Sequence, residues 1–192
     1  MAYDSVFKTG LFAGQTILVT GGGSGIGRCV AHELAYLGAH VVLVGRKLEK
    51  LESTCAEIIE DGGSASFAMC DIREEEAVKA MVKTVIAERG PIHHLVNNAG
   101  GQYMTPLEAI SAKGWEAVVN TNLTGGFLFA REVFKQSMQQ HGGSIVNIVV
   151  VTTHGLYGIA HSIAARSGVI GLSRALAVEW APLNVRINCI AP

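Results

Sequence analysis

Residues 15–27 read QTILVTGGGSGIG, an apolar run that passes directly into a glycine-rich segment. Glycines 21, 25 and 27 have the spacing G-x-x-x-G-x-G, and apolar residues recur at helical intervals after them. A strand, a glycine turn and a helix in this order can cradle a pyrophosphate, because glycine permits close backbone approach and the helix N-terminus supplies free N–H groups. A merely flexible glycine loop would not need these apolar flanks. We therefore predict a dinucleotide site with contacts from Gly21, Ser24, Gly25, Ile26 and Gly27.

The rest of the chain alternates short apolar runs with stretches of helical period, which is typical of βαβ units around a parallel sheet. Leu48, Leu51, Cys55 and Ile58, for example, form one helical stripe that ends before Gly62. The pattern predicts a single α/β domain over residues 1–192, a doubly wound parallel sheet of the Rossmann type with helices on both faces. The predicted strands are residues 17–19, 40–44, 65–70, 94–97, 144–151 and 185–190, and the later helices are about 48–59, 74–89, 115–138 and 159–180.

Composition excludes several classes of function. The chain has 192 residues, of which 49% are apolar and 16% charged, and its net charge is −1. No excess of positive charge favours nucleic acid or an anionic membrane surface as a partner. Residues 1–10 lack an apolar signal core, and no apolar run of about 18 residues occurs. We expect a soluble, unexported, cytoplasmic protein.

The cysteines and histidines do not form a metal-binding pattern. Four cysteines are scattered without a C-x-x-C pair, and the seven histidines form no H-x-x-x-H. Buried, reduced thiols are therefore expected rather than disulfides or zinc ligands. We predict no metal site.

The ends of the second and third predicted strands carry charged residues. Arg46 and Lys47 stand where an NAD site usually has an acid for the ribose 2′-hydroxyl, about 20 residues beyond the glycine turn. A solvated basic loop is the alternative, but the position favours a 2′-phosphate and hence NADP. Asp71, followed by Ile72, either accepts a hydrogen bond from the adenine amino group or caps the next helix, and the sequence favours neither role.

The motifs together make the chain similar to the short-chain dehydrogenase/reductase family over nearly its whole length. They are the glycine turn, NNAG at 97–100, NLTG at 122–125, GGSIVNI at 142–148 and RINCIAP at 186–192. The resemblance implies that Asn98, Ala99 and Gly100 pack beside the adenine ribose. It also implies that Asn122 kinks its helix and holds a water of the proton relay.

The chain departs from that family's catalytic set of Ser, Tyr and Lys. The resemblance places Ser162 at the tyrosine position, Arg166 at the lysine position and Val149 or Val150 at the serine position. Arg166 keeps the positive charge and can bond the nicotinamide ribose, but a guanidinium is effectively never deprotonated and cannot relay a proton. Ordinary ketone or alcohol chemistry is therefore disfavoured.

A narrower resemblance restores an enzymatic interpretation. Residues 100–102, 113–115 and 161–169 resemble the peroxisomal trans-2-enoyl-CoA reductase branch and its 2,4-dienoyl-CoA reductase relatives, which also have Ser at the tyrosine position. This implies an acyl-CoA-type substrate and leaves a peroxisomal location open. Hydride addition to an enoyl thioester builds an enolate, whose oxygen mainly needs hydrogen-bond donors. We expect Ser162 and Asn122 to be those donors.

The proton donor for the α-carbon stays open. Tyr157, His154 and His161 are candidates by position, although packing explains an aromatic residue at a helix start as well. The dienoyl-reductase tyrosine position holds Val151. Ile170 and Arg174 replace a Tyr-x-x-x-Lys found further along this helix in mammalian-type enoyl reductases.

The resemblance also bears on assembly and on the end of the chain. The family continues beyond Pro192 with a substrate-covering loop and helix and a further strand, so either the sequence is a fragment or the lid is absent. The two long helices would form a dimer contact in this family, which implies a homodimer or homotetramer, while core packing explains many of the same residues: Phe127, Phe129, Phe134, Leu172 and Leu176.

These observations favour an NADPH-dependent oxidoreductase that reduces the 2-enoyl double bond of an acyl-CoA thioester, with Asn122, Ser162, Arg166 and Tyr157 as catalytic candidates. Two alternatives remain open. One is a non-enzymatic dinucleotide-binding protein on the same fold, because the usual catalytic residues are replaced. The other is a carbonyl or alcohol oxidoreductase.

Overall fold

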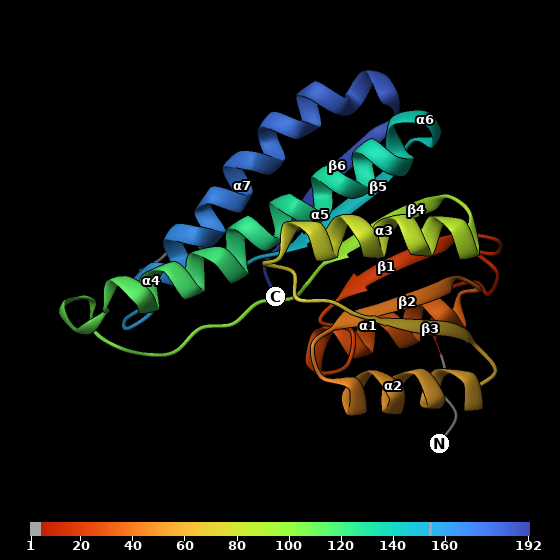
Figure 1. Cartoon of the computed structure of the whole chain (residues 1–192), viewed down its shortest axis with the longest axis horizontal. Coiled ribbons are helices and arrows are strands. Elements are labelled where there is room, and N and C mark those ends of the chain that lie inside the picture. The colour runs from red at the N-terminus through yellow and green to blue at the C-terminus, as the bar shows by residue number, and fades with distance from the viewer. Residues whose placement is uncertain (1–4, 154) are drawn as a thin grey trace.

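The chain folds into one parallel sheet between two layers of helices (Figure 1). The computed structural model describes residues 5–153 and 155–192. The six strands, in the order β3-β2-β1-β4-β5-β6, are β1 (Thr16–Thr20), β2 (His40–Gly45), β3 (Ser64–Met69), β4 (Ile92–Asn97), β5 (Gly143–Ile148) and β6 (Val185–Ile190). The main helices are α1 (Gly25–Tyr36), α2 (Leu48–Glu60), α3 (Glu75–Arg89), α4 (Ala112–Val119), α5 (Gly125–Val133), α6 (Gln139–His141) and α7 (Ala160–Trp180). Short 3₁₀ helices are η1 (Leu107–Ala109) and η4 (Ala181–Leu183).

Alternate residues of the central strand β1 supply two separate apolar cores. Ile17 and Val19 face α1 and α2, whereas Leu18 faces the layer that contains α3, α5 and α7. This follows from the two-residue period of a strand, which sends neighbouring side chains to opposite faces. The doubly wound α/β fold predicted from the sequence is therefore confirmed.

The order of the strands places a ligand site between β1 and β4. The connections run outward from this pair in opposite directions, so the loops after β1 and β4 diverge. In open α/β sheets ligands bind outside the carboxyl ends of the strands at such a point. The glycine turn and the NNAG segment, which follow β1 and β4, lie on either side of it.

The prediction for the start of β4 was wrong by two residues. The strand begins at Ile92 rather than His94, and its pairing with β1 shifts between Thr16 and Ile17. His93 occupies this irregularity, where its Nδ1 accepts from the backbone N–H of Thr16 at 3.0 Å. A bulge of this kind disrupts the pairing locally, and the apolar run from which the strand was predicted does not reveal it.

Strands β1, β2, β3 and β5 also differ from their predicted bounds, by one residue at each differing end except the end of β5. β3 spans Ser64–Met69 instead of 65–70. β5 ends at Ile148 rather than 151, because the N–H of Val149 already reaches the carbonyl of Ile190, the last residue of the neighbouring β6. Apolar character continues beyond this point, but the partner strand does not.

The helix predicted over residues 115–138 runs from Ala112 to His141 with two interruptions. Its start is earlier because the Ser111 hydroxyl accepts from the N–H of Gly114 at 3.1 Å and caps it. Between the α-helical pieces lie two π-helical segments, η2 (Asn120–Thr124) and η3 (Phe134–Met138). Asn122 lies within η2, and π-helical turns of this kind are frequent at functional sites.

In the described part of the chain, no helix combines the length and the apolar character needed to cross a membrane.

Candidate functional site

The glycine turn has the backbone geometry that its spacing predicts. Gly21 has a φ of +67°, in the left-handed region that favours glycine. A Cβ on Gly27 would overlap the carbonyl oxygen of Gly21 and the side chain of Asn98, so only glycine lets helix α1 approach this closely. Ser24 is the N-cap of α1 but makes no side-chain capping bond. The N-terminus of α1 therefore presents uncapped N–H groups of the kind that bind phosphate.

A cavity of about 280 Å³ opens beside this turn. Its walls come from the loops after four strands and from the long helix. The cavity therefore brings together most of the residues predicted to contact the cofactor. Ile26 is not part of these walls and is 47% exposed. The lining residues include Gly21, Ser24, Arg46, Lys47, Lys50, Asp71, Ile72, Arg73, Ala99, Gly100 and Thr121.

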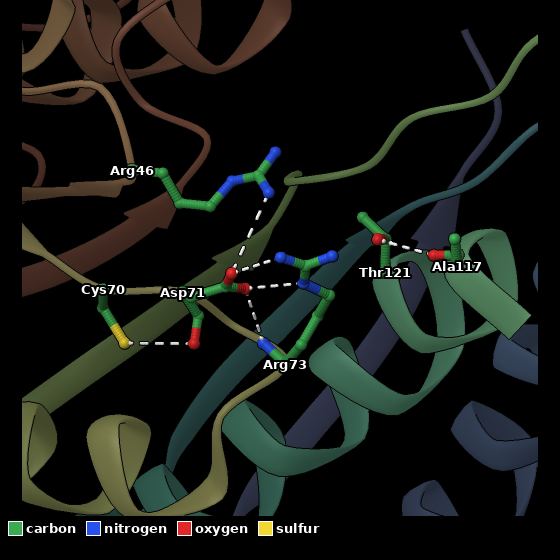
Figure 2. Close-up of polar contacts among 6 residues, drawn as sticks. All are labelled: Arg46, Cys70, Asp71, Arg73, Ala117 and Thr121. Carbon is green, nitrogen blue, oxygen red and sulfur yellow. Dashed lines mark hydrogen bonds and ion pairs between the residues drawn. The ribbon is translucent and has the colours of Figure 1, made fainter.

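Asp71 is held by arginine side chains rather than by the following helix (Figure 2). Its carboxylate accepts from Nε and Nη2 of Arg73 at 2.9 and 2.5 Å and from the Arg73 backbone N–H at 3.1 Å. These bonds lower the pKa of Asp71 to about 2. The capping alternative was wrong, because the N-cap of α3 is Glu74.

The cavity is strongly basic. Arg46, Lys47, Lys50 and Arg73 face a single acid, Asp71, whose carboxylate lies 3.9 Å from the Arg46 guanidinium. The Arg46 side chain is 61% exposed and therefore accessible to a ligand. This charge balance suits a phosphate. Lys50 and Arg73 were not predicted as site residues, although Lys50 follows Arg46 by four residues, about one helical turn.

The NNAG segment is fastened to the end of β1 through Thr20. The Thr20 hydroxyl oxygen accepts from the backbone N–H groups of Asn98 and Ala99, both at 3.0 Å. The Asn98 side chain donates to the Thr20 carbonyl at 3.0 Å. Thr20, whose role the sequence did not indicate, thus holds the segment whose Ala99 and Gly100 line the cavity.

The Asn122 side chain makes two hydrogen bonds to the backbone of Gly101, directly after NNAG. Its Nδ2 donates to the carbonyl of Gly101 at 2.7 Å, and its Oδ1 accepts from the Gly101 N–H at 2.9 Å. Asn122 also lines a small cavity of about 20 Å³, together with Arg166. Such a volume has room for about one water molecule. Both polar ends of the amide already have protein partners.

Arg166 lies beside Asn122 and is partly buried. Its Nη1 donates to the carbonyl of Ile148. A Cβ on Gly100 would overlap its Nη2 and lie 2.7 Å from Oδ1 of Asn122, so the three residues meet at one point. Burial lowers the pKa of the guanidinium, and no carboxylate among the described residues pairs with it. The site therefore holds an uncompensated cation.

Ser162 has a different partner from the substrate oxygen predicted above. The side chain is fully buried, and its hydroxyl donates to Oε1 of Gln102 at 2.6 Å. Gln102 itself is exposed. No role was predicted for Gln102, because only the fold brings its side chain against Ser162 of α7.

Neither of the two described proton-donor candidates, Tyr157 and His161, lines the small cavity that Asn122 and Arg166 share. Tyr157 is 80% exposed in the loop before α7. His161 is fully buried with its ring 4.7 Å from that of Tyr103, edge to face, and neither ring nitrogen has a hydrogen-bond partner within the described ranges. This supports the packing alternative for His161. His154 lies outside the described residues.

The cysteines and the described acidic residues form neither a disulfide nor a metal-ligand cluster. The four cysteines are free, and burial raises the pKa of the Cys70 thiol to about 11. Within residues 5–153 and 155–192, no cluster of three or more histidine, cysteine or carboxylate side chains could hold a metal ion.

Comparison with known proteins identifies relatives of this chain. Residues 15–192 match the family model described as short chain dehydrogenase. The chain is 36% identical to a probable 2,4-dienoyl-CoA reductase of Bacillus subtilis over 93% of its own length and 71% of the relative's. It is also 36% identical to D-threitol dehydrogenase of Mycolicibacterium smegmatis, over 93% of its own length and 69% of the relative's.

Among solved structures, the chain is similar to the citronellol catabolism dehydrogenase AtuB of Pseudomonas aeruginosa. The two are 65% identical with a TM-score of 0.96, over 99% of this chain and 78% of that one. The names of these relatives span several substrates, but the fold, the glycine turn and the family model agree. The chain belongs to the short-chain dehydrogenase family of NAD(P)-binding oxidoreductases.

Proposed function

We propose that this protein uses NADPH to reduce the 2,3-double bond of an acyl-CoA thioester. The observation that carries the proposal is Arg166, a partly buried cation that pairs with no carboxylate among the described residues and stands where the family usually has lysine. It meets Gly100 and Asn122 at the end of the sheet where the site lies. A fixed cation of this kind stabilises negative charge that develops during a reaction.

The charge at this point suits an enolate better than an alkoxide. Bound NADPH would supply a hydride for the β-carbon of the substrate. The electrons of the carbon–carbon double bond would then join the α-carbon to the carbonyl carbon, and the carbonyl π electrons would shift to the thioester oxygen. Arg166 stabilises the resulting oxyanion, and water supplies the proton at the α-carbon. Reduction of a ketone would instead require a proton on the oxygen, which a guanidinium gives up too reluctantly.

The basic cavity supports NADPH as the cofactor. The turn at Gly21 and Gly27 and the uncapped N-terminus of α1 fit a pyrophosphate, and the cations at positions 46, 47 and 50 fit a 2′-phosphate. In this proposal Asp71 and Ile72 contact the adenine, with Asp71 oriented by Arg73.

The test is to add substrates to the full-length protein with NADPH and follow the nicotinamide absorbance. We expect turnover with crotonyl-CoA and with a longer 2-enoyl-CoA, and none with a simple ketone. Restoring the family residues with Ser162→Tyr and Arg166→Lys should not increase enoyl reduction. Turnover of ketones but not of enoyl thioesters would overturn the proposal.

A second candidate follows from the relative that is 65% identical and named for citronellol catabolism. It is the oxidation of a branched, acyclic alcohol or the reverse reaction. Citronellol with NADP⁺ or NAD⁺ tests this directly in the same assay. NADPH binding without turnover of any of these compounds would favour the non-enzymatic alternative.

We also propose a homodimer or homotetramer in which α5 and α7 face a second copy. Phe127 is 37% exposed on α5 and accessible for such a contact, with the Arg131 guanidinium 5.1 Å from its ring centre. Phe129 is fully buried, and Phe134 stacks on Trp180 at 3.9 Å, so these two belong to the protomer's own core. Light scattering on the full-length protein checks the assembly, and a monomer would contradict it.

A further inference from the structure

Gln102 lies in the segment that follows β4 and contacts the first turn of α7. The preceding residue, Gly101, is clasped at both its N–H and its carbonyl by Asn122 at 2.9 and 2.7 Å. The Gln102 side chain is held in turn by Ser162, whose hydroxyl donates to Oε1 at 2.6 Å. The backbone before Gln102 and one end of its amide are therefore both fixed.

A glutamine amide has one accepting oxygen and one nitrogen with two donor hydrogens. Ser162 occupies the oxygen, which leaves Nε2 as the group that the fixed amide can present to a ligand. Within the described residues, Nε2 makes no hydrogen bond. Ser162 is fully buried, whereas Gln102 is exposed, so a substrate can reach the amide but not the hydroxyl.

We propose that Gln102 Nε2 donates a hydrogen bond to the thioester carbonyl oxygen, and that Ser162 is a positioning residue that acts through Gln102. This inference rests on the proposed enoyl reduction. In place of the direct contact expected for Ser162, Ser162 orients Gln102 and Gln102 contacts the substrate. An amide does not transfer its proton, which is acceptable here because the oxygen of an enolate needs a donor rather than an acid.

The sharpest test replaces Gln102 by glutamate, which is nearly the same shape. An ionised carboxylate only accepts hydrogen bonds, whereas the protonated acid also donates. Gln102→Glu should therefore lower kcat at neutral pH by roughly 10²-fold or more, the typical effect of losing an oxyanion donor. Its kcat relative to the parent should rise as the pH falls toward the ordinary glutamate pKa of about 4.3.

The matched control is Gln140→Glu, which adds the same charge on exposed α6 at the far end of the long helix (Figure 1). It should keep the pH profile of the parent, and melting temperature and NADPH affinity verify that both variants fold. A Gln102→Glu variant whose kcat ratio to the parent does not change with pH would overturn the inference.

A double-mutant cycle separates the positioning role from direct contact. If Ser162 acts through Gln102, Ser162→Ala should lower kcat in the parent but not in a Gln102→Met background. Equal losses in the two backgrounds would mean that Ser162 acts on the substrate by itself.

These outcomes distinguish the inference from the function on which it rests. A parent that reduces crotonyl-CoA, with Gln102 variants as active as the parent, overturns the role of Gln102 alone. A parent that does not reduce enoyl thioesters overturns both.

Discussion

The region around the glycine turn and the region around Arg166 lie at the same edge of the sheet, yet they use their polar groups differently. In the first, an exposed guanidinium, two lysines and an uncapped helix N-terminus face an open cavity of about 280 Å³. In the second, the side chains of Asn122 and Ser162 already make hydrogen bonds to Gly101 and Gln102. The cofactor region has polar groups available to a ligand, whereas the reaction region has satisfied most of its own.

This difference predicts whether the effects of substitutions in each region should be additive or coupled. Each cation of the basic cavity can contact a phosphate directly, so its replacement should change affinity by its own increment. Around Arg166 the side chains depend on one another, because Asn122 fixes Gly101 and Ser162 fixes Gln102. Substitutions there should be coupled rather than additive.

Arg166→Met should have the largest effect on turnover. It removes the one cation beside Gly100 and Asn122 while keeping a long apolar stem. We expect kcat for enoyl reduction to fall about 10²–10³-fold, equivalent to roughly 2.7–4 kcal/mol of transition-state stabilisation. Steady-state kinetics measure this, with Arg89→Met at the exposed end of α3 as control. An unchanged kcat would remove the charge argument for enoyl reduction.

Arg46→Asp should reverse the cofactor preference. The exposed guanidinium would be replaced by an acid that repels a 2′-phosphate and can accept from a ribose 2′-hydroxyl. The loss of one charge-assisted contact should weaken NADPH binding by about 1.5–3 kcal/mol. Titration with NADPH and NADH measures both affinities, and Lys83→Asp on the exposed face of α3 controls for net charge. Equal affinities of the parent for NADPH and NADH would contradict the assignment.

Asn122→Ala should reduce stability and turnover together. The peptide groups of Gly101 lose their partners, which costs about 1–3 kcal/mol in the free energy of unfolding. Release of this segment also displaces Gln102. Urea unfolding and kcat on one preparation report the two effects, with Asn120→Ala, exposed in the same π-helical segment, as control. Loss of stability with full turnover per folded molecule would assign Asn122 a structural role only.

Arg73→Met should have the smallest effect, and one that depends on pH. The folded-state pKa of Asp71 lies below its ordinary value of 3.8, at about 2, so the contribution of the Asp71–Arg73 pair to stability is fully present above pH 3.8 and is lost as the pH falls through about 2. Both side chains are partly exposed, and we expect a difference of about 0.2–1 kcal/mol in the free energy of unfolding near neutral pH.

Urea unfolding of the parent and of Arg73→Met at neutral and acidic pH measures this difference. It should shrink on acidification, and Lys83→Met, which removes an exposed cation of α3 outside the pair, should show no such trend. A difference that grows as the pH falls would contradict the assigned pKa.

The sequence predicted the order of the elements well because hydrophobic period is a local property. Short apolar runs and 3.6-residue periods identified all six strands and the long helices, and β6 was placed correctly at both ends. The predicted strand boundaries were wrong where hydrogen bonds to residues distant in the sequence determine the end of a strand. β4 begins earlier because Ser137 exchanges hydrogen bonds with Ile92, and β5 ends earlier because β6 does.

The sequence by itself determined the doubly wound fold, the glycine turn and the position of Arg46, since each follows from residue type and spacing along a short stretch. Only the tertiary structure decided which polar groups remain free. The bond between Ser162 and Gln102 joins residues 60 positions apart, and the clasp of Asn122 on Gly101 joins residues 21 apart. No local pattern encodes such partners, because they depend on how β4, the long helix and α7 converge in space.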